Sequence, residues 1–272
     1  MKKQFLLFAL CAFFSAGAIA QTTSMTSKNG HEILPQEGDY SLSMNAVPLV
    51  DFALNAMNIM NNTGQTAATP DYATGFDQTI VGKQFTSATT ADRVRVSIAH
   101  YSSSTSTFAD DGSGGEIEDV AKTRETDILL GYGKEMRRGH NRLQGFYGYE
   151  GMLQLGGGGT SNEYGSDLAD GASRQLSTSD GLSFGLGARG FVGAEYFFAP
   201  KMSVGAEFGW GLGITRDGRG STETETNDGG SISTTETDGS TSGGEWGFEV
   251  DNGPGSTLLG GGSAALTLNL HF

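Results

Sequence analysis

The last seven residues of the chain alternate between apolar and polar side chains. The apolar positions are Leu266, Leu268, Leu270 and Phe272, and the polar positions between them are Thr267, Asn269 and His271. Because successive side chains of a β-strand point to opposite faces, this segment would have one apolar and one polar face. Such a strand suits a β-barrel that faces lipid outside and a polar lumen inside. We therefore interpret the segment as a membrane-spanning strand.

Seven earlier segments have a comparable length and pattern. They cover residues 40–50, 76–86, 93–101, 125–134, 142–155, 182–198 and 202–214, before a last segment at 258–272. Long polar connections at about 51–75, 102–124, 156–181 and 216–257 alternate with short turns. Outer-membrane barrels have short periplasmic turns and long extracellular loops. The sequence therefore predicts an all-β fold for residues 38–272, an eight-stranded antiparallel transmembrane β-barrel with four long extracellular loops.

One part of this pattern allows two interpretations. Between residues 48 and 60, Val50, Leu54, Met57 and Met60 recur near helical spacing, which favours a short amphipathic helix. The alternative is that the first strand continues beyond the membrane.

The first twenty residues have the three parts of a secretory signal peptide. A positive start with Lys2 and Lys3 precedes an apolar run and the small-residue pattern that ends at Ala20. We expect cleavage between Ala20 and Gln21, a bacterial outer-membrane location after export, and a short periplasmic segment over 21–37. The only cysteine, Cys11, lies in the signal peptide, so the mature chain would contain no thiol.

The charge of the mature chain excludes one class of partner. Without Lys2 and Lys3, the 17 basic residues fall to 15 against 31 acidic ones, a net charge near −16. A chain this acidic is a poor binder of nucleic acid. After the signal peptide, the sequence contains no apolar run long enough for a transmembrane helix. A membrane-spanning form would have to be a closed barrel, because lipid leaves no partner for an open sheet edge.

These features together resemble the small eight-stranded outer-membrane barrels of the OmpA/OmpX-like family, within the porin-like superfamily. The resemblance covers residues 38–272 and rests on the signal peptide, the alternation of short and long connections, and the terminal strand. It implies that Leu266, Leu268, Leu270 and Phe272 form the insertion signal read by the barrel-assembly machinery. The long Gly-, Ser-, Thr- and Asp-rich loops resemble barrel proteins of the Bacteroidetes type. The resemblance identifies a mode of membrane insertion and no activity.

Ten charged residues face the predicted lumen when the apolar residues face outward. They are Lys83, Arg93, Arg95, Asp127, Glu135, Arg142, Glu150, Arg189, Glu195 and Glu207. They form either a network of ion pairs that fills the barrel or the lining of a narrow channel. An eight-stranded barrel is just wide enough for side chains to fill, and buried charges persist only when paired. We therefore favour the filling network over the channel.

The loop at 216–257 is the most acidic part of the chain. Its carboxylates could bind Ca²⁺, but their spacing matches neither the EF-hand loop nor the glycine-rich Ca²⁺ repeat. We interpret it as a solvated, mobile acidic loop. We expect no metal site and no cofactor, and a structural or adhesive role in the cell envelope, with an extracellular partner that no motif names.

One motif suggests catalysis. His100, Tyr101 and Ser102 form a His-x-Ser sequence at the outer end of the third segment. It resembles the lipid-facing pair of lipid A deacylases, which are also eight-stranded barrels and in which His acts as a base on Ser. The motif of those enzymes continues with Asn, whereas Ser103 stands here. The sequence identifies no orienting acid, although Glu116 or Glu118 could approach His100. A deacylase-like serine hydrolase is therefore an alternative, and our main interpretation is a barrel without catalysis.

The remaining expectations concern partners and the main alternative fold. We expect a monomer in contact with outer-membrane lipid. A soluble secreted β-sandwich would need a second sheet to cover the outer faces of the last four segments.

Overall fold

The structure is a computed structural model, and it describes residues 25–53, 79–110, 115–139, 141–239, 246–250, 257–258, 261–262 and 264–272. The predicted signal peptide and its cleavage site at Ala20 and Gln21 lie outside these residues, as do parts of the predicted connections. Within the described residues, no helix has both the length and the hydropathy to span a membrane.

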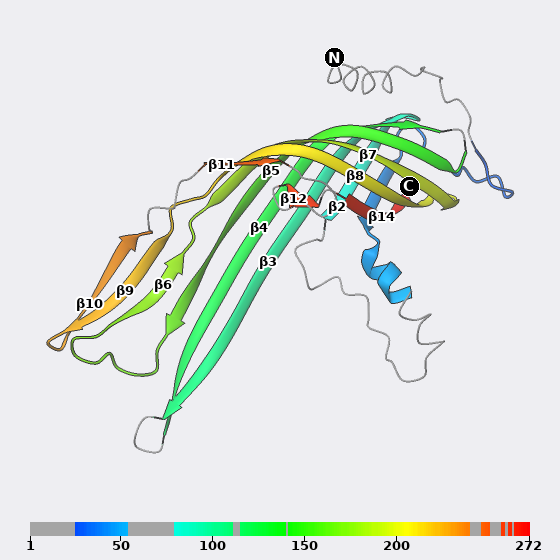
Figure 1. The fold of residues 1–272 in the computed structure, drawn as a ribbon. Coiled ribbons are helices and arrows are strands. Elements are labelled where there is room, and N and C mark those ends of the chain that lie inside the picture. Colours follow the sequence, from blue (N-terminus) through cyan, green and yellow to red (C-terminus); the bar gives the residue numbers. More distant parts are fainter. Residues whose placement is uncertain are drawn as a thin grey trace, which may run out of the picture.

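Eight antiparallel strands close into a barrel, which confirms the predicted all-β, eight-stranded antiparallel architecture (Figure 1). The barrel strands are β1 (Tyr40–Asn45), β2 (Thr79–Ser87), β3 (Thr90–Asp110), β4 (Glu116–Arg138), β5 (Leu143–Glu163), β7 (Ser183–Ala199), β8 (Met202–Arg216) and β14 (Ala264–His271). Closure occurs at β1, where Leu42 pairs with Gly82 of β2 on one side and with Leu270 of β14 on the other. The chain therefore returns to its first strand, which removes the open edges of a flat sheet.

Side chains alternate between the interior and the exterior of the barrel along each strand. In β8, exposed and buried positions alternate from Met202 to Gly213. The exposed set contains Met202, Val204, Phe208, Trp210, Leu212 and Ile214. In β14, Asn269 and His271 are buried inside, whereas Phe272 is 69% exposed. The sequence alternation therefore translates directly into the two faces of the barrel wall.

The strands on one side of the barrel continue well beyond it. Residues 102–110 and 116–124, expected to form a loop, continue β3 and β4 as one hairpin with no shift in register. Four further strands are β6 (Ser173–Ser179), β9 (Ser221–Asp228), β10 (Ser231–Asp238) and β11 (Trp246–Val250). β5 pairs with β6, β6 with β9 and β9 with β10, so the sheet widens away from the barrel (Figure 1). We call residues 98–110, 116–127 and 157–163 with β6, β9 and β10 the outer sheet.

The interpretation of 216–257 as a loop is therefore wrong for β9 and β10, which are strands. Both faces of the outer sheet meet solvent, so its strands carry no alternation of apolar and polar residues. Thr residues favour strands even so, because a β-branched side chain fits the pleated surface. β11 pairs with the outer end of β8, and β12 (Thr257–Leu258) and β13 (Gly261–Gly262) form a separate small ladder.

Residues 47–53 are helical directly after β1. For these residues the helical interpretation is correct, and β1 ends at Asn45. Residues 54–60, the rest of the segment for which a helix was considered, lie outside the described part of the chain.

Two phenylalanines inside the barrel each cover a glycine on the neighbouring strand. Phe146 of β5 pairs with Gly193 of β7, and Phe191 of β7 pairs with Gly148 of β5. A Cβ atom on Gly193 would lie 2.2 Å from the Phe146 ring, and one on Gly148 would lie 2.5 Å from Phe191. The rings pack in the space that the glycines leave, which fixes the register of the two strands.

We expect Gly193→Ala to lower the free energy of unfolding by about 1–3 kcal/mol, because the new methyl group overpacks the interior against Phe146. Gly82→Ala is the matched control, since a Cβ there has no heavy atom within 4 Å. The measurement is urea unfolding of the refolded barrel in detergent. An equal loss of stability in both variants would contradict the proposed interlocking of ring and glycine.

Candidate functional site

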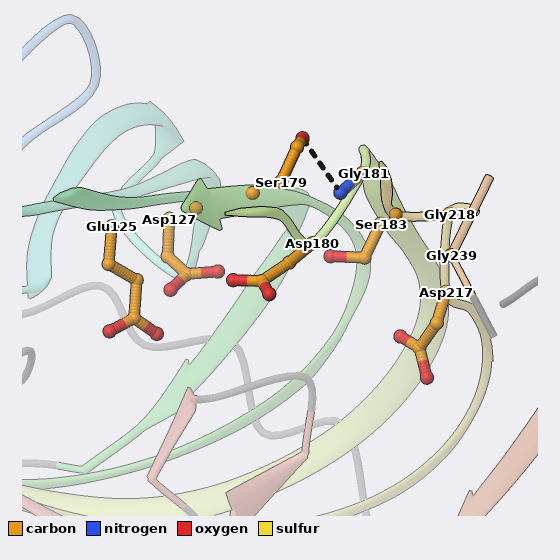
Figure 2. Close-up of a pocket in the computed structure, with 12 residues that line it drawn as sticks. Glu125, Asp127, Ser179, Asp180, Gly181, Ser183, Asp217, Gly218 and Gly239 are labelled. Atoms are coloured by element: carbon orange, nitrogen blue, oxygen red, sulfur yellow. Dashed lines mark hydrogen bonds between the residues drawn. The ribbon is translucent and has the colours of Figure 1, made fainter. Parts of the chain in front are cut away.

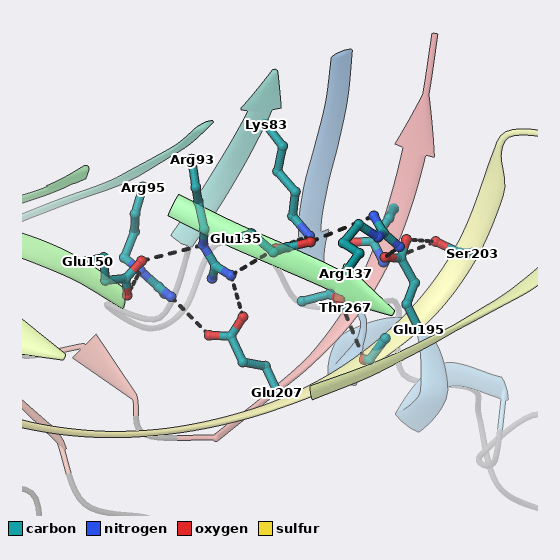
Figure 3. A network of polar contacts seen from close by, with 12 residues as sticks. Lys83, Arg93, Arg95, Glu135, Arg137, Glu150, Glu195, Ser203, Glu207 and Thr267 are labelled. Carbon is teal, nitrogen blue, oxygen red and sulfur yellow. Dashed lines mark hydrogen bonds and ion pairs between the residues drawn. The ribbon is translucent and has the colours of Figure 1, made fainter. Parts of the chain in front are cut away.

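Eight of the ten predicted lumen charges lie together inside the barrel, each at most 7% exposed. They are Lys83, Arg93, Arg95, Glu135, Glu150, Arg189, Glu195 and Glu207. They come from β2, β3, β4, β5, β7 and β8, and they meet because each occupies an inward position of its strand. In Figure 3, polar contacts run from Glu150 and Arg95 through Glu207, Arg93 and Glu135 to Lys83. The structure therefore contains a network of buried ion pairs.

The part of the network nearer the outer sheet contains three guanidinium groups and two carboxylates. Arg93 contacts Glu207 at 2.6 Å and Glu150 at 3.4 Å. Arg95 contacts the same two carboxylates at 3.2 and 2.9 Å, and Arg189 contacts them at 3.1 and 2.8 Å. Each carboxylate thus has three arginine partners. We call these five residues the outer cluster.

The part nearer the short turns centres on two other carboxylates. Lys83 Nζ lies 2.7 Å from Glu135, and Arg137 bridges Glu135 and Glu195. Glu195 also accepts a hydrogen bond from Ser203 and lies 2.9 Å from His271 Nε2. We call these residues the inner cluster. Arg93 joins the two clusters through a longer contact of 3.5 Å with Glu135.

Arg137 is the residue that the sequence analysis missed. The fourth predicted segment ends at Lys134, whereas β4 continues to Arg138. Arg137 lies two residues after Glu135 and so faces the same side of the strand. A longer predicted strand would therefore have placed Arg137 in the lumen. Ser203 and Asn269 are also buried and hydrogen-bonded to each other, at 3.2 Å.

The other two predicted lumen charges lie apart from the network. Arg142 is half-buried at a turn and donates hydrogen bonds to the carbonyl oxygens of Phe197 and Phe198, at 2.9 and 3.1 Å. Asp127 is half-buried at the opposite end of the barrel wall. Among the described residues, it makes no ion pair.

An apolar layer closes the turn side of the lumen beneath the inner cluster. Phe85 and Phe197 are almost fully buried, and the segment before β1 packs Ile33 and Leu34 against Phe197. The Arg137 guanidinium lies over both phenylalanine rings, at 5.3 and 5.6 Å from their centres. Side chains therefore fill the described interior at two successive levels, as the narrow bore of an eight-stranded barrel favours.

A second concave region lies where the barrel meets the outer sheet (Figure 2). It has a volume of about 470 Å³ and carries the carboxylates of Glu125, Asp127, Asp180 and Asp217 among glycines. Among the residues that the structure describes, no group of three or more potential ligands converges as a metal site would require. This acidic hollow has the charge to attract cations.

The predicted catalytic pair lies on the outer face of β3 without contact between its members. His100 Nδ1 lies 2.9 Å from Thr126 Oγ1 on β4. Ser102 is exposed and pairs in register with Arg124. Within the described part of the chain, no carboxylate contacts His100. The arrangement of base, nucleophile and orienting acid is not assembled here.

The sequence of this chain matches no family model and no curated protein.

We expect Glu207→Ala to destabilise the barrel by about 3–5 kcal/mol, because it leaves buried guanidinium groups without their carboxylate. Glu163→Ala is the matched control: its ion pair with Lys122 is exposed, and such pairs contribute about 0–1 kcal/mol. Urea unfolding, monitored by the gel migration of the unheated protein, measures the stability of both variants. Equal stabilities would show that the network does not hold the barrel together.

Proposed function

We propose that this chain is an integral outer-membrane β-barrel protein that anchors the outer sheet at the cell surface, in a structural or adhesive role. The observation that supports this proposal is the distribution of polarity across a closed barrel wall. Charged residues gather in the interior, and large apolar residues face outward on all eight strands. A water-soluble barrel has the opposite arrangement.

The outward apolar surface is too continuous for a soluble monomer. Ile80 on β2, Val94 on β3, Leu130 and Tyr132 on β4, and Val192 on β7 are each at least 42% exposed. Contiguous apolar patches of more than a few hundred Å² are rare on soluble monomers and mark contact with lipid or with a partner. A closed barrel also pairs the backbone groups that lipid cannot satisfy. The soluble sandwich is disfavoured, because the wall closes on itself and no second sheet covers this surface among the described residues.

The filled interior favours an anchoring role over transport. The ion-pair network and the apolar layer occupy the bore in succession, which supports a barrel that does not conduct over a narrow channel. The outer sheet is polar, and its carboxylates outnumber its basic residues. On β9 and β10 the acidic residues are Glu223, Glu225, Asp228, Glu236 and Asp238. A partner for this surface would therefore carry positive charge or bind through cations.

Cysteine labelling tests the membrane location, because the expected mature chain contains no cysteine. Ser233→Cys on β10 and Val192→Cys on the barrel wall both place the thiol at an exposed position. In intact cells, we expect a membrane-impermeant maleimide to label Ser233→Cys, whereas lipid protects Val192→Cys. Thr89→Cys, in a short turn, should react only after the outer membrane is permeabilised. Rapid labelling of Val192→Cys in a detergent-free soluble fraction would contradict the proposal.

An assay with lipid A separates the proposal from the deacylase alternative. If the barrel has no catalytic role, purified protein mixed with lipid A should release no fatty acid, and Ser102→Ala should match the wild type. Release of fatty acid that depends on both His100 and Ser102 would overturn the proposal in favour of the hydrolase.

A further inference from the structure

A cavity of about 250 Å³ lies in the barrel interior next to the outer cluster. Its walls come from the ends of β1, β2 and β14 farthest from the short turns, and from β3 and β8. Arg93, Arg95 and Glu207 are its charged lining residues, and Ser43, Thr79 and Thr267 are among its uncharged polar ones. At about 30 Å³ per water molecule, this volume holds several water molecules, or one small solute together with a smaller number of water molecules.

Both arginines that line this cavity retain nitrogen atoms that the network does not use. Arg93 contacts its carboxylates through Nη1 and Nε, and Arg95 does so through Nε and Nη2. Neither Arg93 Nη2 nor Arg95 Nη1 makes a hydrogen bond with a described residue. Neither is among the fully buried side-chain atoms without a partner, so both reach the cavity space. Each presents two N–H donors there.

The charge of the described lining is mainly positive. Glu207 is the one carboxylate among these residues, and it already contacts both arginines. Ser43 also belongs to the lining, but its Oγ is fully buried, so it does not reach the cavity space. The unused nitrogens of Arg93 and Arg95 are therefore the charged donors that this cavity offers.

We propose that this cavity binds one small soluble oxyanion of the phosphate, sulfate or carboxylate class. The free guanidinium N–H groups of Arg93 and Arg95 would bind its oxygens. Guanidinium groups suit such oxygens because their N–H donors form a planar fork. The excess of guanidinium groups over carboxylates in the outer cluster favours a negative rather than a neutral solute. The site depends on the barrel interior and not on the role of the outer sheet.

Inorganic phosphate is the probe for this proposal. The measurement is the thermal unfolding midpoint of the full-length mature barrel in detergent, in sodium phosphate and in sodium chloride of equal ionic strength. Binding to the folded state raises the midpoint by mass action, so we expect a higher midpoint in phosphate that saturates with concentration. An identical midpoint in both salts would overturn the proposal.

Two serines of β1 provide a matched pair of positions. Ser41 and Ser43 are both 3% exposed, but only Ser43 belongs to the cavity lining. We expect Ser43→Asp to abolish the phosphate effect, because it adds a carboxylate to the cavity, and Ser41→Asp to retain it. Equal effects of phosphate on wild type and Ser43→Asp would show general salt stabilisation and refute the site.

Discussion

The narrow bore of an eight-stranded barrel is the constraint on which the rest of this structure depends. A wall of eight strands encloses a space that side chains alone can fill, so each inward charge must find its partner inside. Four carboxylates and five cationic side chains achieve this through shared contacts, with Glu150 and Glu207 each meeting three arginines. The network joins six strands that are distant in sequence. Loss of one member therefore affects the whole wall.

Much of this barrel could be predicted from sequence, because alternation is strong where one face of a strand is apolar. The segments at 182–198 and 202–214 correspond closely to β7 and β8, and their parity identified Arg189, Glu195 and Glu207 as inward. The alternation of apolar and polar residues gave no signal where both faces of a strand are exposed to solvent. Residues 102–124 carry no apolar face, so their pairing in a long hairpin had no signal other than Thr content. Arg137 was missed for a related reason, since Met136 and Arg138 beside it are not a clear apolar face.

The details of the interior could not be predicted in the same way. The alternation along a strand shows which face a residue lies on but not its position along the barrel axis. This is why Asp127 faces the acidic hollow instead of joining the network. The alternation also does not show which nitrogen of an arginine contacts a carboxylate. The cavity beside Arg93 and Arg95 depends on that choice, and also on the ending of β1, β2 and β14 before their neighbours.

The uninterrupted register of β3 and β4 has a consequence for the electrostatics of the molecule. The described pairing of β3 with β2 reaches Ser97, and residues 98–110 extend for about 40 Å beyond it at roughly 3.3 Å per residue. The Debye length at physiological salt is only about 8 Å. Charges near the tip of the hairpin, such as Glu116 and Glu118, are therefore screened from anything at the level of the apolar band. The tip and the barrel are electrostatically independent, so charges at the tip of the hairpin can change without altering how the barrel wall meets its surroundings.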